Sequence, residues 1–254
     1  MPASRPNRCP DRNLYVAMKT HIGTSGWTYD HWRGNFYPSD LPKERWLAYY
    51  AECFDTVELN ASFYRSMRES TFAKWHEKTP RGFVWSVKAH RFITHIRRLK
   101  DVGAPLETFF ASVAPLAEKQ GPVLFQLPPS LGFQKTDFES FCALLPAGLK
   151  FTIEARNRQW CTDEALSCLQ SHGIAWCIAD TAGRYPCLEA VTADFVYIRL
   201  HGSRSLYASD YTEEELAAWA EKINGWDRET YVYFDNDFMA FAPHNALRLK
   251  TLLE

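Results

Sequence analysis

Charged side chains of both signs stand at or near the ends of separate apolar runs in this sequence. The seven that stand out are Glu58, Lys88, Glu154, Arg156, Asp180, Arg199 and His201. Carboxylates and imidazoles take up and release protons, whereas guanidinium and ammonium groups hold carboxylates and phosphates. Brought to one place, such groups would perform acid–base chemistry on a small anionic substrate.

Four of these residues carry a carboxyl or imidazole group, which takes up and releases protons. The candidate catalytic residues are therefore Glu58, Glu154, Asp180 and His201. We expect Glu154 or Glu58 to act as general base and His201 to act as acid or proton shuttle, in a proton abstraction, an isomerisation or a hydrolysis. The same four side chains leave a divalent metal site as the alternative. Because the neighbouring cations would repel such an ion, we expect no metal and no other cofactor.

Residues near the same strand ends are candidates for binding the substrate. Arg199 and Arg156 are expected to fork onto the anion, and Lys88 to add a point charge. Aromatic residues in 27–37 suit flat rings or sugars, although packing as a hydrophobic lid accounts for them equally well. The full set is Trp27, Tyr29, Asn60, Lys88, Gln126, Arg156, Arg199 and Asn236.

The segment 88–100 is rich in basic side chains and histidines. They are Lys88, His90, Arg91, His95, Arg97, Arg98 and Lys100. Such a cluster suits phosphate, so a nucleotide-binding or nucleic-acid-binding module that stacks bases on 27–37 is the alternative function. An ordinary solvated loop has the same composition. Steep salt dependence without turnover would favour the binding module over an enzyme.

Apolar runs that suit strands alternate with amphipathic stretches that suit helices. The strand candidates are 21–26, 56–60, 83–88, 122–127, 150–156, 174–180, 195–201 and 229–236. The helix candidates are 42–53, 68–78, 105–119, 136–145, 162–172, 212–224 and 242–253, with a short one at 184–190. This alternation predicts an α/β protein with a single (β/α)8 TIM barrel. An open doubly wound sheet is the alternative, but its glycine-rich turn is missing after the first strand.

Polar residues alternate with apolar ones along several strand candidates. Glu58 and Asn60 share one face of their strand, and Glu154 and Arg156 share one face of theirs. Asp180 is predicted to oppose the small apolar residues of its strand and to point inward. Since barrel active sites lie at the C-terminal strand ends, we expect all these residues at the barrel mouth. A self-satisfied network of internal salt bridges is the alternative.

Composition sets the limits of these interpretations. The 254 residues carry 29 Lys and Arg against 30 Asp and Glu, so no global charge indicates a nucleic acid or a membrane as partner. Residues 1–18 are predicted to be a disordered leader before a barrel domain at 19–254. Seven scattered cysteines without a Cys-x-x-Cys pair argue against disulfides and zinc ribbons. With no long apolar run, the sequence predicts a cytoplasmic protein.

Several motifs together resemble a known family. They are Ile22-Gly23-Thr24-Ser25-Gly26-Trp27, Val57-Glu58-Leu59-Asn60, Ser86-Val87-Lys88, Phe125-Gln126-Leu127-Pro128-Pro129, Tyr197-Ile198-Arg199-Leu200-His201-Gly202 and Phe234-Asp235-Asn236-Asp237. The chain is similar over residues 21–253 to the YecE-like family, domain of unknown function 72. The resemblance implies a TIM barrel but names no reaction. The family usually has Glu-Phe-Arg-His where this chain reads Glu154-Ala155-Arg156-Asn157, so a histidine at that place has no role here.

Overall fold

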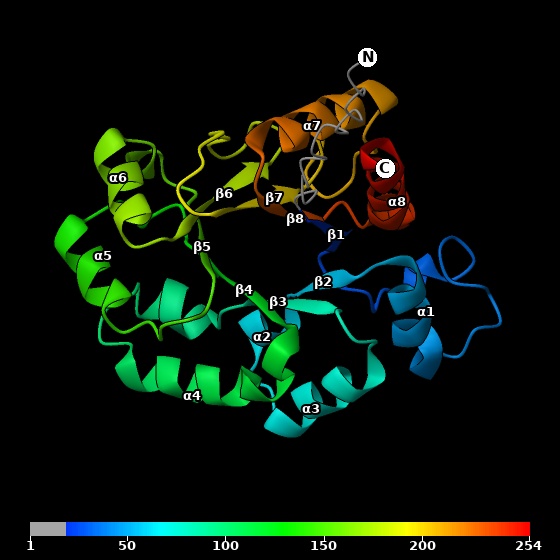
Figure 1. Ribbon diagram of the computed structural model, residues 1–254, viewed down its shortest axis with the longest axis horizontal. Helices are drawn as coiled ribbons and strands as arrows, with labels where there is room; N and C mark the ends of the chain where they lie inside the picture. Colours follow the sequence, from blue (N-terminus) through cyan, green and yellow to red (C-terminus); the bar gives the residue numbers. More distant parts are fainter. Residues whose placement is uncertain (1–18) are drawn as a thin grey trace, which may run out of the picture.

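Eight parallel strands form a nearly closed ring with helices on its outside (Figure 1). The structure is a computed structural model that describes residues 19–254; the leader predicted for 1–18 lies outside the described residues. The strands are β1 (Thr20–Thr24), β2 (Thr56–Leu59), β3 (Val84–Lys88), β4 (Gln120–Gln126), β5 (Phe151–Glu154), β6 (Ala175–Asp180), β7 (Phe195–Leu200) and β8 (Glu229–Phe234). From β2 to β8 each strand pairs with the next one in sequence, and β8 pairs with β1. The predicted (β/α)8 barrel is confirmed.

The α-helices follow the strands along the chain. They are α1 (Trp46–Cys53), α2 (Ala61–Tyr64), α3 (Glu69–Lys78), α4 (Gly103–Val113), α5 (Lys135–Cys142), α6 (Asp163–Ser171), α7 (Glu213–Trp226) and α8 (Phe241–Leu253). Thr162 and Thr212 cap α6 and α7 by accepting backbone N–H bonds. The short helix predicted at 184–190 is wrong: the described chain has no helix between β6 and β7, where Pro186 removes a backbone donor.

Five short helical turns complete the mouth and the outer loops, and a sixth precedes α1. They are η1 (Asp30–Trp32), η2 (Lys43–Arg45), η3 (Phe92–Ile96), η4 (Ala114–Lys119), η5 (Arg158–Trp160) and η6 (Phe238–Ala240). Of these, η1, η3, η5 and η6 follow strands β1, β3, β5 and β8 directly, and therefore lie at the C-terminal face. They shape the entrance above the strand ends.

Closure of the ring depends on a close approach between β1 and β2. No ladder joins the two strands, but an isolated parallel bridge links Ser25 to Glu58. A Cβ atom added at Gly23 would lie 2.2 Å from the carbonyl oxygen of Thr56. Only glycine therefore allows β1 to lie against β2, which brings Ser25 beside Glu58.

Two apolar layers lie on the two faces of the barrel sheet. The larger one packs between strands and helices, and the smaller one fills the barrel with Leu124, Ala175, Cys177, Ala179, Phe195, Tyr197, Tyr231 and Tyr233. Trp176 and Ile178 belong to the outer layer, and Asp180 follows their parity. The inward direction predicted for Asp180 is therefore wrong. Both faces of β6 are apolar, so alternation alone could not show which one is inside.

Two further findings concern the described residues 19–254. No helix among them is long and apolar enough to cross a membrane. The six cysteines that fall in this range are all free thiols, as the scattered spacing predicts.

Candidate active site

Arg199 occupies the centre of the barrel mouth and binds three carboxylates. Its Nε lies 2.9 Å from Glu58 Oε2, and its Nη2 lies 2.7 Å from Glu58 Oε1. Its Nη1 donates to Glu154 Oε2 at 2.6 Å, and its Nη2 also lies 3.1 Å from Asp235 Oδ2. The side chain of Arg199 is only 1 % exposed. All three nitrogens of the guanidinium group are therefore engaged within the protein, and the predicted fork onto a substrate anion is not supported by these contacts.

Glu58 lies at the bottom of the same cluster and is surrounded by donors. Besides Arg199, the hydroxyl of Tyr197 donates to its Oε2 at 2.7 Å and the hydroxyl of Ser25 to its Oε1 at 2.6 Å. Ser25 reaches it because β1 and β2 meet at the Gly23 contact. Glu58 is fully buried and does not line the pocket. Its role in the cluster is therefore to hold Arg199 in place.

Glu154 connects two arginines. Oε1 accepts from Arg156 Nε at 2.9 Å, while Oε2 accepts from Arg199. Burial by itself would raise the pKa of Glu154, but the two guanidinium groups outweigh burial and hold the pKa below its usual range. Glu154 is therefore a carboxylate at neutral pH.

Asp235 and His201 complete the cluster from β8 and β7. His201 Nδ1 lies 2.9 Å from Asp235 Oδ2, although the pair does not make a well-directed hydrogen bond. His201 Nε2 lies 3.2 Å from Arg199 Nη1. Burial opposes ionisation of Asp235, but Arg199 and His201 lower its pKa overall. The contacts of Asp235 use Oδ2 alone, which leaves Oδ1 without a hydrogen bond to the described residues.

Lys88 differs from Arg199 because it has no carboxylate partner. Its Nζ donates to Gln126 Oε1 at 2.6 Å and lies 4.3 Å from the centre of the Phe63 ring. The part of the chain that the structure describes places no carboxylate within ion-pair distance of this nitrogen. Burial, reinforced by Arg199, lowers the pKa of Lys88 to about 8.

A pocket of about 390 Å³ opens above these groups at the mouth. It is lined by Tyr29, Asn60, Phe63, Tyr64, Lys88, His95, Gln126, Arg156, Arg199, Tyr207, Asp235 and Asp237. Six of the predicted substrate-binding residues are among them: Tyr29, Asn60, Lys88, Gln126, Arg156 and Arg199. Asn60 Oδ1 is buried and accepts no hydrogen bond from the described residues, so a donor on a bound molecule would satisfy it.

Three predicted site residues lie elsewhere. Asp180 accepts a hydrogen bond from the Tyr211 hydroxyl at 2.9 Å, outside the barrel interior. Asn236 Nδ2 donates to the Ser209 carbonyl and to Asn245 Oδ1, both at 2.9 Å, and so fastens the end of β8 to α8. Trp27 is buried against Trp75 and Trp85 in the outer layer. None of the three lines the pocket.

The loop after β1 behaves mostly as the hydrophobic lid that was the alternative interpretation. Trp32, Phe36 and Tyr37 are buried, and Tyr37 stacks on Trp46. Tyr29 is the exception, since it lines the pocket and donates to the Ser25 carbonyl at 2.6 Å.

Sequence reasoning did not assign six of the pocket residues to the site. They are Phe63, Tyr64, His95, Tyr207, Asp235 and Asp237. Inward parity in β8 would have found Asp235, two residues after Tyr233. His95 belongs to the basic segment, whose composition does not indicate that one of its side chains reaches the pocket. Tyr207 reaches the pocket through a backbone with φ of 65°, which no pattern in its loop reveals.

A family model described as "Protein of unknown function DUF72" matches residues 21–254. This chain belongs to the DUF72 family. UPF0759 protein YunF of Bacillus subtilis is 26 % identical over 92 % of this chain and 94 % of its own length. UPF0759 protein YecE of Escherichia coli is 23 % identical over 88 % of each chain.

Solved structures agree with the fold of this DUF72 protein. A DUF72 family protein from Thermotoga maritima is 30 % identical, with a TM-score of 0.84 over 92 % of this chain and 99 % of that chain. A DUF72 family protein from Enterococcus faecalis is 19 % identical, with a TM-score of 0.80 over 92 % of this chain and 95 % of that chain. The second likeness shows the fold alone.

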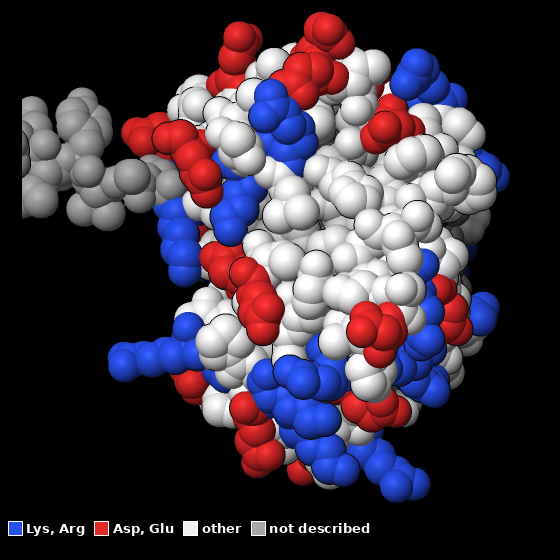
Figure 2. Space-filling view, turned by 90° about the vertical axis from the view of Figure 1, so that its right-hand side faces the viewer, with Lys and Arg blue, Asp and Glu red and all other residues white. Residues whose placement is uncertain are grey.

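Three side chains near the end of the basic segment of this DUF72 protein are held by local contacts. Arg97 binds Asp101 at 2.9 Å, Lys100 binds Asp137 at 2.8 Å, and Arg98 donates to Ser130. Figure 2 shows charges of both signs side by side around a broad uncharged centre on the face that it displays. These contacts are those of a solvated loop held by local ion pairs.

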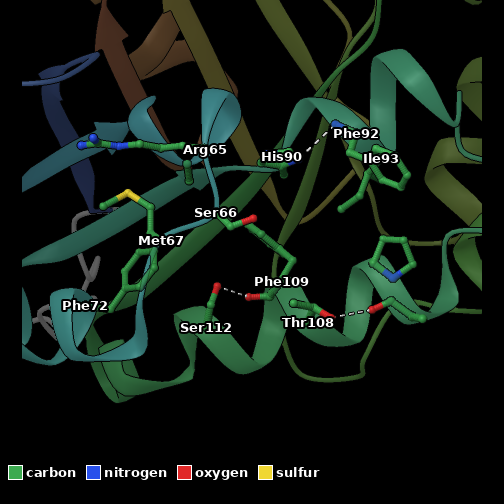
Figure 3. A pocket seen from close by; sticks show the side chains of 13 residues that line it. Arg65, Ser66, Met67, Phe72, His90, Phe92, Ile93, Thr108, Phe109 and Ser112 are labelled. Carbon is green, nitrogen blue, oxygen red and sulfur yellow. Dashed lines mark hydrogen bonds between the residues drawn. The ribbon is translucent and has the colours of Figure 1, made fainter.

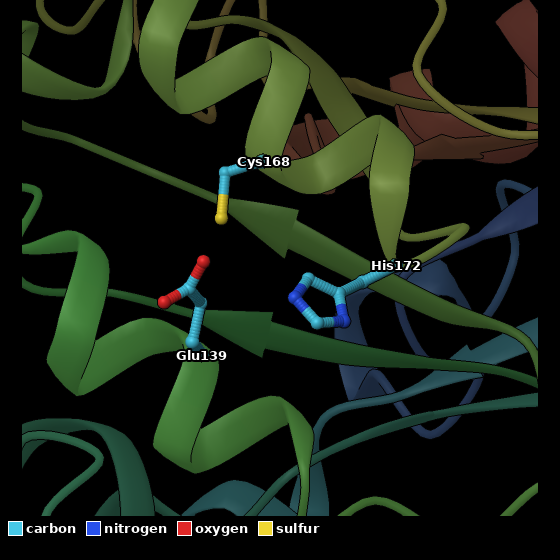
Figure 4. Close-up of side chains that lie close together, drawn as sticks. All are labelled: Glu139, Cys168 and His172. Carbon is cyan, nitrogen blue, oxygen red and sulfur yellow. The ribbon is translucent and has the colours of Figure 1, made fainter.

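Two features lie outside the mouth of the DUF72 barrel. Among residues 19–254, the one grouping of three metal-ligand side chains is Glu139 on α5, Cys168 on α6 and His172 directly after α6 (Figure 4). A second pocket of about 420 Å³ lies near α3, α4 and the loop after β3, where Met67, Phe72 and the other labelled side chains form its wall (Figure 3). Neither includes a predicted site residue.

Proposed function

We propose that this DUF72 protein is an enzyme that binds a small carboxylate or phosphate substrate at the barrel mouth and moves a proton on it. The observation that carries the proposal is a pair of cations in the pocket wall. Lys88 has only the neutral Gln126 as hydrogen-bond partner. Arg156 donates to Glu154 through Nε alone, and no hydrogen bond joins its terminal amino groups to a described carboxylate.

Arg156 is the better of the two for a forked contact. Its guanidinium lies 4.6 Å from the centre of the Tyr185 ring, which fixes its plane. Anchored by Nε and by this ring, the two terminal amino groups can donate to two oxygens of one anion. In its protonated form Lys88 adds a second positive charge to the same pocket.

Two aspartates of the pocket suit the acid and base roles. Arg199 holds the pKa of Asp235 low against the effect of burial, whereas burial and the charge of Asp235 raise the pKa of Asp237. Neighbouring groups with pKa values pushed apart are typical of a base and an acid that act together. In this proposal Asp235 Oδ1 accepts a proton and Asp237 donates one. Glu58 and Glu154, the bases expected from the sequence, position Arg199.

Binding is tested by thermal unfolding with inorganic phosphate, at an ionic strength held constant with chloride. A ligand at about 100 times its Kd stabilises the folded state by roughly 2.7 kcal/mol. We expect wild type to show this gain, Arg156→Ala to lose most of it, and the loop variant Arg97→Ala to keep it. An equal response of all three proteins would contradict a specific anion site.

Catalysis is tested by incubating the protein with small carboxylates and sugar phosphates in deuterated water and following hydrogen exchange by NMR. We expect exchange with wild type and its loss in Asp235→Asn and Asp237→Asn, while the exposed Asp101→Asn keeps it. Steeply salt-dependent binding of oligonucleotides without exchange would favour the binding module instead.

A further inference from the structure

The ε-amino group of Lys88 has the surroundings of a nucleophile. It is buried at the end of β3 with 6 % of the residue exposed, and it forms part of the pocket wall. The Phe63 ring covers one side of it at 4.3 Å. Burial and the nearby charge of Arg199 both disfavour the ammonium form and bring the pKa to about 8, so a sizeable fraction is neutral amine near that pH.

Gln126 fixes the direction of the amine. Its Oε1 is an acceptor, so it takes one N–H of Lys88 at 2.6 Å. A neutral amine held in this way has its lone pair away from that hydrogen bond. Because no described carboxylate pairs with Nζ, no ion pair has to be broken before the lone pair is used.

We propose that Lys88 attacks the carbonyl carbon of a small anionic aldehyde or ketone and forms an imine. The proposal rests on the proposed function for the place of the substrate, whose anionic group lies on Arg156. Its substrate class is narrower: a small molecule that carries both a carbonyl and a carboxylate or phosphate. A pocket of about 390 Å³ admits molecules of this size.

The chemistry needs no oxidant and no metal. The lone pair of Nζ forms the C–N bond, the carbonyl electron pair moves to oxygen, and a proton converts that oxygen to a hydroxyl. Nitrogen then loses its protons, the hydroxyl takes one and leaves as water, and the product is the imine. Asp237 lines the same pocket, and its carboxylate can carry a proton from the nitrogen to the oxygen.

Imine formation also explains what the proton transfer would act on. Once protonated, an imine withdraws electrons from the adjacent carbon and makes its C–H bond more acidic. Asp235 Oδ1 has no hydrogen bond to the described residues, lies on a side chain that lines the pocket, and accepts that proton in our scheme. The two protonation states of Lys88 thus have different uses, since the ammonium form attracts the anion and the amine form reacts.

Reductive trapping tests the proposal on the full chain. The protein is incubated with pyruvate or glyceraldehyde 3-phosphate and reduced with borohydride, and the modified peptide is identified by mass spectrometry. We expect one adduct, on Lys88. Lys88→Arg keeps the charge without a nucleophilic amine and should lose the adduct, with thermal unfolding as the check that it is folded. Lys100→Arg, an exposed lysine changed in the same way, should keep it.

The outcomes separate this inference from the proposed function. Adducts spread over exposed lysines and unchanged in Lys88→Arg would overturn the imine, while phosphate stabilisation lost in Arg156→Ala would still support the anion site. An adduct on Lys88 that forms equally in Arg156→Ala with both probes would support the nucleophile and contradict the anion site. No adduct at all with either probe counts against Lys88 as the nucleophile.

Discussion

Replacing Arg199 by methionine removes the one cation that contacts Glu58, Glu154 and Asp235 together. Glu58 and Glu154 are almost fully buried, so water cannot replace the lost partner there, whereas Asp235 is partly exposed at the pocket. Breaking a buried pair costs about 3–5 kcal/mol. Because one guanidinium serves three carboxylates, we expect a loss of about 5 kcal/mol near neutral pH, which is the whole stability of a marginal domain.

The pH dependence of this loss identifies its cause. In wild type the pKa of Glu154 lies below its usual value, so its stabilisation is present above the unfolded pKa and is lost as the pH falls through the folded one. In Arg199→Met, Glu154 keeps Arg156 but loses the guanidinium that lowers its pKa most, so its pKa rises relative to wild type and this stabilisation is reduced. The difference between the two proteins should therefore be large near pH 7 and small near about pH 4.

Urea unfolding followed by tryptophan fluorescence measures the free energy of unfolding of both proteins at each of the two pH values. Arg248→Met is the matched control, because Arg248 pairs with Glu213 on the exposed surface. We expect the control to leave the free energy of unfolding nearly unchanged. A difference between wild type and Arg199→Met that is the same at both pH values would refute the argument that buried carboxylates cause the loss.

Two further predictions concern stability. The pKa of Lys88 is about 8 in the folded state and 10.5 ordinarily, so the folded state binds fewer protons between these values and stability should gain up to about 3 kcal/mol across this window. Denaturant unfolding at stepped pH should show this gain in wild type relative to Lys88→Met, and parallel pH profiles would contradict it. Gly23→Ala should destabilise by about 2 kcal/mol or more, because its Cβ would meet the Thr56 carbonyl at 2.2 Å. Gly225→Ala, where nothing lies near the added carbon, should not destabilise.

The strands and most helices could be predicted because their patterns are local. All eight strand candidates overlap observed strands, and inward parity correctly placed Glu58, Glu154 and Arg199 inside the barrel. Parity failed for Asp180 because both faces of β6 carry apolar residues. When both faces of a barrel strand are apolar, the volume left by the neighbouring strands decides which face turns inward. The sequence of one strand does not contain that information.

The different roles of the charged residues at the mouth could not be predicted from the sequence, because they depend on which cation contacts which carboxylate in the folded chain. Arg199 and Arg156 look alike as inward arginines, yet one is enclosed by three carboxylates and the other keeps two amino groups unpaired with them. The same holds for the carboxylates. Glu58 uses both oxygens on Arg199 and on hydroxyl donors, while Asp235 uses one.

Depth in the barrel therefore separates the groups that bind one another from the groups that we propose to react. The lower layer, with Arg199, Glu58 and Glu154, is held together by short ion pairs and cannot reorganise without breaking them. The upper layer, with Arg156 and Asp235, is positioned by the lower one. Glu154 holds Arg156 by Nε, and Arg199 holds Asp235 by Oδ2. Three groups are then left for a ligand in the pocket: the terminal amino groups of Arg156, Asp235 Oδ1 and the Lys88 amine. In a purely structural network of salt bridges, these three groups would be paired with one another or with their neighbours. Because they are not, the site has polar groups that a ligand would satisfy.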